Sequence, residues 1–410
     1  MKGRIRGADA ALLGLAIAFF TLAGFQGQPR PLEVFALILF LPLALVVTGI
    51  TQRAWVAAGY LLILGIVVRI AYLDPSFLGS DVLPIAEEAI DVLLDGGNPY
   101  GHEYVVSTNP YAFPPGNLLY YLPGFLLGDM RATEIFAAGT VLVGLAWAAW
   151  LIRNDWPVAA MGLYAAAPPL IELSTEGSND TSAGALLFVS ALLLLVARRQ
   201  SNGGLLLLSA LLMGETLAFK LYMLPFWPFL VAYLGSQPWR LSLTAGASRS
   251  LRASAWLAYA SVSAGFAGLV SLPFFLWSPT AFVDDLLSWS SATIHPIDGW
   301  NVWAFLLRWQ GWNAQSALGD NLPRIDVALM LAAIIIGLII GVRRPSRALL
   351  FGAATWFVLM FFARWTTWAY FAGIAPVVLL IPFADQLVEP PEVREKAEKS
   401  PVTKAGLPVP

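Results

Sequence analysis

The chain has 410 residues, of which 58% are hydrophobic and 12% charged, with a formal net charge of -2. A soluble domain usually carries roughly twice that charged fraction, so soluble globular classes are excluded. The near-neutral charge and the lack of a basic stripe exclude a nucleic-acid partner. With no cysteine and two histidines, the sequence also excludes disulfide frameworks, thiolate nucleophiles, zinc-thiolate sites and His-rich metal centres.

Apolar runs of about 17 to 25 residues, long enough to cross a hydrocarbon core about 30 Å thick, recur along most of the chain. The positively charged start resembles a signal peptide, but no small-residue cleavage site follows, so we expect a retained first helix. The fold class predicted is an all-α, polytopic transmembrane bundle of about twelve spans within a membrane domain over residues 1–384. The spans are expected near residues 9–25, 31–50, 54–73, 131–152, 156–175, 180–197, 203–219, 220–235, 254–277, 325–342, 347–362 and 368–384.

Arginine positions set the expected orientation, because cytoplasmic loops carry an excess of positive charge. If both termini are cytoplasmic, every arginine cluster between the spans falls inside, provided that residues 117–128 do not cross. We therefore expect that segment of about a dozen residues to be re-entrant or interfacial. Residues 385–410 lack the apolar content to fold and predict a disordered cytosolic tail. The absence of a targeting segment favours the plasma membrane of a prokaryote.

Two large segments, residues 74–131 and 278–324, then lie outside and are rich in Trp, Tyr, Pro and Gly. Residues 82–95 place apolar side chains at helical spacing, with acidic side chains on the remaining arc. This pattern predicts a helix lying on the membrane surface, with short interfacial helices in the outer loops.

Asp81 is the first candidate for chemistry, because it stands just before that amphipathic helix and near the membrane surface. A carboxylate there is placed to deprotonate an acceptor hydroxyl. An N-cap aspartate is an equally good interpretation of the same position.

Lys220 is the second candidate, since it interrupts an apolar stretch near the outer turn between two spans. It could neutralise a lipid phosphate as a compact charge. It could instead pair with Glu215 or extend its charged end toward the interface. Glu176-Gly-Ser-Asn-Asp180, the third candidate, joins two spans on the outer side and could be a turn with Asp180 capping the next helix.

The later outer loop adds His295, Trp300 and several more indoles, and Arg364 stands at the outer mouth of the last hairpin. Indole faces stack on sugar rings, but they also form the interfacial belt of membrane proteins. An interfacial anchor is also the commoner role for Arg364. All five groups fall on one side of a topology that arginines alone define, which favours a site there.

Four segments before the middle of the chain are Arg69 to Asp74, Gly79-Ser80-Asp81, Leu93 to Tyr100 and Phe113-Pro114-Pro115-Gly116. In this order they resemble the first outer loop of C-superfamily polytopic glycosyltransferases, most closely the polyprenyl-phosphate-mannose-dependent branch (family 87-like). Glu176 to Asp180, and Lys220-Leu221-Tyr222 with Pro225, are similar to further segments of that branch. The resemblance is good over residues 54–235 and only general elsewhere. Two spans precede the one that usually comes first.

The resemblance implies a hexosyltransferase that moves a sugar, mannose by analogy, from a polyprenyl-phosphate donor to an extracytoplasmic glycolipid or glycan. Asp81 would be the general base of an inverting displacement, and Lys220, His295 and Arg364 would hold the donor phosphate. We expect substrate contacts from Asn179, Asp180, Tyr100, His102, Tyr222 and Trp300. Because Val82 replaces the second acidic residue found in many relatives, we expect metal-independent chemistry with no cofactor.

Two other functions remain open from the sequence. A lipid or glycolipid flippase would place charges near the bilayer midplane on broken helices, whereas the predicted midplanes are apolar. A surface-polysaccharide polymerase or ligase would share the site and the membrane lipid partner. It would be expected to use a diphosphate-linked glycan instead.

Overall fold

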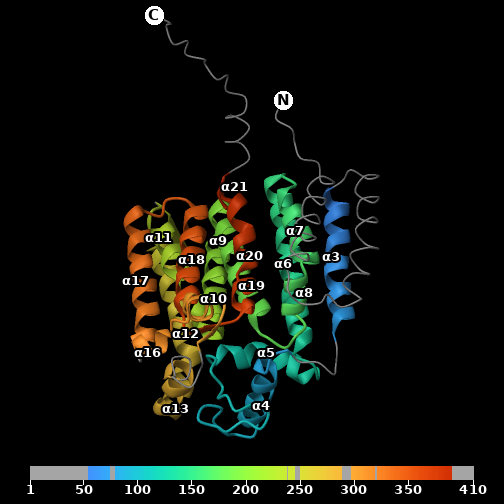
Figure 1. The fold of residues 1–410 in the computed structure, drawn as a ribbon. Coiled ribbons are helices and arrows are strands. Elements are labelled where there is room, and N and C mark those ends of the chain that lie inside the picture. The colour runs from blue at the N-terminus through green and yellow to red at the C-terminus, as the bar shows by residue number, and fades with distance from the viewer. Residues whose placement is uncertain are drawn as a thin grey trace, which may run out of the picture.

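The protein is an α-helical bundle whose helices run roughly side by side (Figure 1). This computed structural model describes residues 54–73, 79–237, 239–244, 250–288, 297–318 and 321–389. Within these ranges, seven segments are long and apolar enough to cross a membrane. They are Trp55–Tyr72, Arg131–Ile152, Asp180–Gln200, Ala255–Trp277, Leu322–Ile340, Pro345–Phe362 and Trp368–Val388. The chain is therefore a helical membrane protein, as the composition predicts.

The long helices follow the predicted spans closely. They are α3 (Ala54–Tyr72), α6 (Arg131–Ile152), α9 (Asp180–Gln200), α12 (Ala255–Trp277), α17 (Leu322–Ile340) and α18 (Pro345–Phe362). Two shorter apolar helices, α10 (Gly203–Phe219) and α11 (Phe226–Gly235), occupy the next predicted pair, with the 3-10 turn η1 (Leu221–Met223) between them. The first two predicted spans lie outside the described residues, so the total of twelve stays a prediction.

Two predicted spans are interrupted. Residues 156–175 form α7 (Trp156–Ala166) and α8 (Pro168–Leu173), because Ala167 adopts an extended conformation before Pro168. The last span is built from α19 (Trp368–Gly373), α20 (Ala375–Leu380), η4 (Ile381–Phe383) and α21 (Ala384–Val388). Helix α21 continues into the segment predicted as a tail from residue 385, whereas residues 390–410 lie outside the described ranges.

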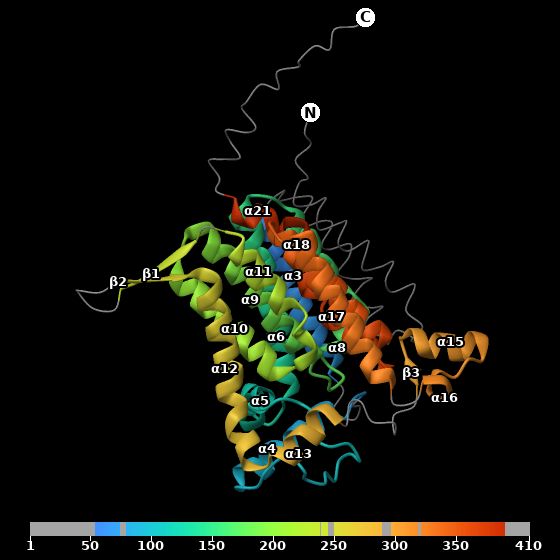
Figure 2. The same cartoon turned by 90° about the vertical axis from the view of Figure 1, so that its left-hand side faces the viewer.

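The two segments that the sequence predicts to lie outside also form helices in their described parts. The predicted amphipathic helix is α4 (Val82–Leu94), and α5 (Gly116–Leu126) lies across the end of the bundle, too short to span it (Figure 1). Helix α13 (Pro279–Val283), the π-turn η2 (Asp284–Ser288), α15 (Val302–Gln310) and α16 (Ala314–Leu318) follow later in the chain. Figure 1 shows α4 and α13 at the same end of the bundle, and Figure 2 shows α15 and α16 projecting beside α17.

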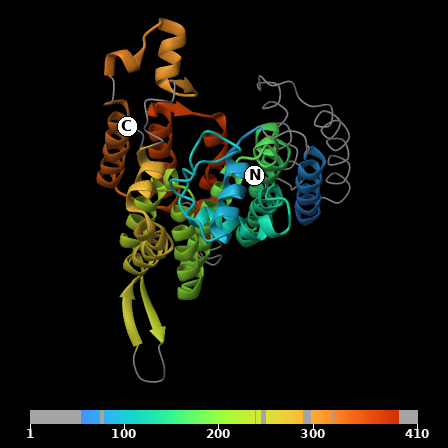
Figure 3. The ribbon, with the colours of Figure 1, turned by 90° about the horizontal axis from the view of Figure 1, so that it is seen from below.

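Two small sheets complete the described structure. Strands β1 (Arg240–Thr244) and β2 (Ser250–Ser254) pair antiparallel, with Arg240 opposite Ser254. This hairpin, which the sequence analysis treats as a loop, extends away from the bundle (Figures 2 and 3). Strands β3 (Asp298–Gly299) and β4 (Trp365–Thr366) pair in parallel.

Helix α9 is the centre of the bundle, with 94% of its span buried inside the protein. Its small residues allow neighbouring backbones to come close, as is usual where membrane helices pack. At Gly184, an added Cβ would lie 1.9 Å from the carbonyl oxygen of Gly373. The start of α9 is therefore tightly packed against the end of α19.

Arg69 supports the interruption between α7 and α8. Its buried guanidinium donates to the carbonyls of Gly65 (2.9 Å), Ala165 (3.3 Å), Tyr164 (3.0 Å) and Leu170 (3.1 Å). Three of these acceptors flank the break, where the helix leaves carbonyls unpaired. Arg69 is part of the family resemblance, but its structural role was not predicted from the sequence.

We predict that Arg69→Lys lowers stability, because one ammonium cannot replace a planar guanidinium that reaches four carbonyls. Each buried acceptor left unpaired costs about 1 to 3 kcal/mol. The thermal midpoint of detergent-purified protein, followed by tryptophan fluorescence, should fall by several degrees. Arg324→Lys is the matched control, since Arg324 is exposed. Equal midpoints for the two variants would contradict this role of Arg69.

Candidate active site

Buried charges gather at one end of the molecule. In the described residues, seven charged side chains are buried: Arg69, Glu134, Glu176, Asp180, Lys220, Asp285 and Arg364. Those on long helices stand near the helix ends that face α4 and α5, such as Glu134 in the first turn of α6 and Asp180 at the start of α9. These buried charges therefore lie toward the end of the bundle that carries α4 and α5 (Figure 1).

Asp81 precedes α4, but its side chain does not cap that helix. Its carboxylate oxygen Oδ2 accepts hydrogen bonds from Ser107 Oγ (2.6 Å) and Asn109 Nδ2 (2.8 Å). Both donors come from the loop between α4 and α5, so the carboxylate faces that loop. The structure therefore orients Asp81 by side-chain hydrogen bonds that the sequence analysis did not identify.

Main-chain hydrogen bonds join this region to the segment before α9. The amides of Gly79 and Ser80 donate to the carbonyl of Glu176 at 2.8 and 3.1 Å. The amide of Leu83 donates to Gly177 at 2.9 Å. The first turn of α4 is thereby fixed to the Glu176-to-Asp180 connection, which places two separately predicted groups side by side.

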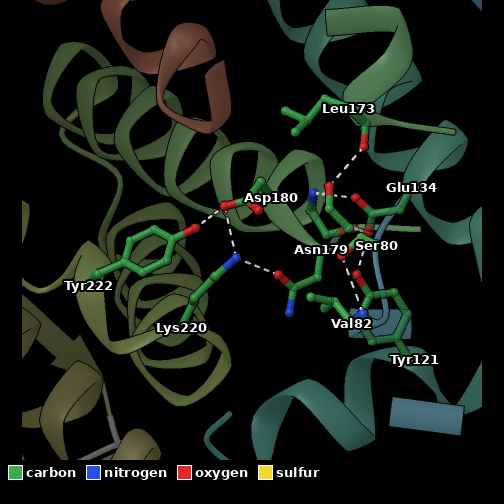
Figure 4. Close-up of polar contacts among 11 residues, drawn as sticks. Ser80, Val82, Tyr121, Glu134, Leu173, Asn179, Asp180, Lys220 and Tyr222 are labelled. Carbon is green, nitrogen blue, oxygen red and sulfur yellow. Dashed lines mark hydrogen bonds and ion pairs between the residues drawn. The ribbon is translucent and has the colours of Figure 1, made fainter. Parts of the chain in front are cut away.

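Asp180 forms a buried ion pair with Lys220. The lysine Nζ lies 2.8 Å from Asp180 Oδ1 and also donates to Asn179 Oδ1, while the Tyr222 hydroxyl donates to Asp180 Oδ1. Figure 4 shows these side chains converging on the start of α9. Lys220 thus pairs with Asp180 instead of Glu215, and Asp180 serves as its partner and not as a helix cap.

Three aromatic rings surround the Lys220 ammonium. Its Nζ lies 4.7 Å from the ring centre of Tyr222, 5.3 Å from Tyr370 and 5.6 Å from Phe113. Cation-π contacts favour a charge in such surroundings. Phe113 opens the Pro-Pro-Gly turn, and at Gly116 an added Cβ would lie 2.7 Å from Ala218 O. The glycine lets this turn pack closely against the helix end that leads to Lys220.

Glu134 is a member of this site that the sequence analysis missed. Its carboxylate accepts hydrogen bonds from the Tyr121 hydroxyl, the Ser182 hydroxyl and the Ser182 amide, the last at 3.1 Å. It thereby satisfies one of the unpaired amides in the first turn of α9 from a different helix. A single acidic residue in the first turn of a predicted span was the available signal. Figure 4 shows Glu134 between Tyr121 and α9.

Glu176 is a buried acid in the connection before α9, outside the spanning helices. Burial, followed by the nearby charges of Glu172 and Asp180, raises the pKa of Glu176 to about 8. The protonated form is therefore favoured at neutral pH in the folded protein.

The structure places two further first-loop predictions apart from this cluster. Tyr100 is buried among Tyr111, Phe274 and Phe282, and its hydroxyl donates to Phe113 O at 2.8 Å. His102 is exposed and contacts Tyr104 edge to face. Tyr100 thus helps to pack the loop, and the substrate contacts predicted for both residues stay predictions.

The candidates in the later part of the chain differ in their exposure. Trp300 is exposed, and its amide donates to Thr366 O at 3.1 Å. Arg364 is buried beside β4, and its carbonyl accepts a hydrogen bond from Asn301. His295 lies outside the described residues. Within the described ranges no group of three or more His or acidic side chains could hold a metal ion, which leaves metal-independent chemistry a prediction.

Comparison with known proteins adds no assignment. No protein-family model matches the sequence, and no curated protein matches it.

We predict that the Lys220–Asp180 pair stabilises the fold only as a pair. Lys220→Met should lower the free energy of unfolding by about 3 to 5 kcal/mol, because it leaves the buried Asp180 carboxylate without its cation. Adding Asp180→Asn should restore most of the thermal midpoint, since the amide still accepts the Tyr222 hydroxyl. A double variant whose loss equals the sum of the two single losses would contradict direct coupling.

We predict that the contribution of Glu176 to the stability of the folded protein depends on pH. The folded state holds a proton that the unfolded state loses near pH 4.5, so its contribution to stability falls as pH rises from about 4.5 to 8. The expected slope is about 1.4 kcal/mol per pH unit. Glu176→Gln should lack this loss. The thermal midpoint of the variant should therefore rise relative to that of the wild type as the pH is raised from 5 to 8. A pH-independent difference between the two proteins would refute the prediction.

Proposed function

We propose that this protein transfers a sugar, mannose in the first instance, from a polyprenyl-phosphate donor to an extracytoplasmic glycolipid or glycan. The observation that carries the proposal is that two side chains hydrogen-bond to the same carboxylate oxygen of Asp81. Ser107 and Asn109 both donate to Oδ2. In the described part of the chain, no hydrogen bond to Oδ1 accompanies them. This arrangement suits a fixed base with one oxygen left for an acceptor hydroxyl.

The proposed reaction is a single displacement. The acceptor oxygen forms a bond to the anomeric carbon as the bond from that carbon to the phosphate oxygen breaks. Asp81 Oδ1 takes the acceptor proton, and polyprenyl phosphate leaves with the bonding electron pair. Attack opposite to the leaving group inverts the anomeric centre.

The departing phosphate requires positive charge in a site of low dielectric. Lys220 is buried at this end of the bundle, and two of its three N–H groups go to Asn179 and Asp180. The third N–H is our proposed contact to the phosphate, with Arg364 and His295 as further partners. Asp180 would hold the ammonium in place until the donor arrives.

Tyr370 belongs to this cluster. Its ring centre lies 5.3 Å from the Lys220 ammonium, which is paired with Asp180. Main-chain hydrogen bonds between the start of α4 and the Glu176-to-Asp180 connection support a role for both carboxylates at one bound substrate. Asn179, Asp180 and Tyr222 are the proposed sugar contacts nearest to this position.

A lipid flippase is the second candidate, favoured by one specific observation. The interrupted helix α19–α20 packs beside α9, as does α8 of the interrupted helix α7–α8, and transporters often build sites from broken helices. Against it, the buried charges gather at one end of the described helices instead of near mid-span. A surface-polysaccharide polymerase or ligase would be distinguished by use of a diphosphate-linked donor.

We predict that Asp81→Asn lowers glycosyl transfer by at least about a hundredfold, because general-base catalysis contributes 10² to 10⁴ in rate. Binding of the donor should change little. The assay uses purified protein in nanodiscs, a panel of polyprenyl-phosphate sugars and a membrane-lipid extract as acceptor. Asp91→Asn, on the exposed arc of α4, is the control and should retain wild-type turnover.

Normal turnover by Asp81→Asn would reject Asp81 as the base. If no donor supports transfer while the wild-type protein moves a labelled polyprenyl-phosphate sugar between leaflets, the flippase function replaces the proposed one. Transfer from diphosphate-linked donors alone would identify a polymerase or ligase.

A further inference from the structure

The segment from Ile297 to Leu318, here called the outer aromatic unit, forms a small body beside the bundle (Figure 2). It contains β3, α15 and α16, and its Trp303 and Ala314 form a small apolar core together with Leu322, which lies just beyond the unit. Asn301 caps α15 by accepting a hydrogen bond from the Ala304 amide at 2.8 Å. The unit is therefore an ordered element in its own right.

Its attachments fix its depth along the bundle. Trp303 Nε1 donates at 2.6 Å to the carbonyl of Phe362, the last residue of α18. Leu322, which belongs to the small core, is the first residue of α17. Strand β3 pairs with β4 shortly after α18, and at Gly299 an added Cβ would lie 1.6 Å from Thr366 O. The unit thus sits at the level where two candidate membrane spans end.

The outward face of the unit is aromatic. Phe305 and Trp309 stand one helical turn apart on α15, with 53% and 71% of their surfaces exposed and their ring centres 4.9 Å apart. Trp300 and Trp312, which flank α15, are 65% and 39% exposed. A helix facing water would place polar residues on this arc. The exposed cation on the same face, Arg308, is paired with Asp298.

The unit stands beside a helix whose surface is apolar (Figure 2). Helix α17 has only 11% of its span buried in the protein, and its exposed side chains include Leu331, Ile335 and Ile339. These side chains face lipid in a membrane protein. Indole and phenyl rings at the end of a span favour the boundary between headgroups and acyl chains.

We propose that the outer aromatic unit is a membrane-surface anchor, whose partner is the lipid leaflet beside α17. Phe305, Trp309, Trp300 and Trp312 enter the headgroup boundary, while the Asp298–Arg308 pair remains among the headgroups. Covering these rings removes apolar surface from water, which is the driving force for such helices. This inference does not depend on the proposed enzymatic activity.

Site-directed labelling tests the proposal, because the chain has no native cysteine. Phe305→Cys and Trp309→Cys, each labelled with the fluorophore NBD, are placed in nanodiscs of phosphatidylcholine and phosphatidylglycerol. Nitroxide lipids then quench labels within the leaflet, and aqueous iodide quenches labels in water. Ile335→Cys, exposed within the α17 span, is the lipid-facing control, and Glu103→Cys, exposed in the loop between α4 and α5, is the water-facing control.

We expect both α15 labels to resemble the Ile335 label, with quenching by nitroxide lipid at least about twofold above the Glu103 label. Their emission should also be shifted to the blue. If both labels match Glu103 and are quenched mainly by iodide, the anchor does not exist. Two positions guard against disturbance of the unit by one substitution.

Discussion

The buried contact between Lys220 and Asp180 is the constraint on which the arrangement of this end of the bundle depends. Removing two charges from water is costly, and the cost is offset only with close geometry and further hydrogen bonds. Asn179 and the Tyr222 hydroxyl supply the hydrogen bonds, and the rings of Tyr222, Tyr370 and Phe113 supply cation-π contacts. The ends of α9 and α10, the Pro-Pro-Gly turn and α19 must therefore stay in register with one another.

The position of Asp81 depends on the elements that this contact holds together. The carbonyls of Glu176 and Gly177, just before Asp180, hold the start of α4, and the loop before α5 holds the Asp81 carboxylate. Glu134 fastens α5 to the first turn of α9. A candidate base in a surface loop is thus connected to a buried ion pair through short, mostly main-chain links. Such support is what a preorganised site requires.

The sequence predicted the parts of this structure that depend on local pattern. Apolar length located the long helices from α3 onward, and helical periodicity located α4. Tertiary partners were not predictable: Lys220 was as consistent with Glu215 five residues away as with Asp180 forty residues away. Pro168 is a local sequence signal for the break at Ala167. The side chain that supports the break, Arg69, could not be predicted, because it lies 101 residues in sequence from its acceptor Leu170. Glu134 was overlooked because one acidic residue in a long span gives little local signal.

The one-sided distribution of buried charge has a physical consequence for function. A carrier must offer its polar site to both leaflets in turn, which favours charges near mid-span between moving halves. Here the buried charges of the described helices stand within a few turns of one end, and the tight contact of Gly184 with Gly373 O opposes sliding of α9 past α19. An enzyme that meets its lipid substrate at one leaflet needs no such movement. The outer aromatic unit beside α17 lies toward that same end of the bundle, so the proposed site and the proposed membrane anchor stand at a similar level along the helices.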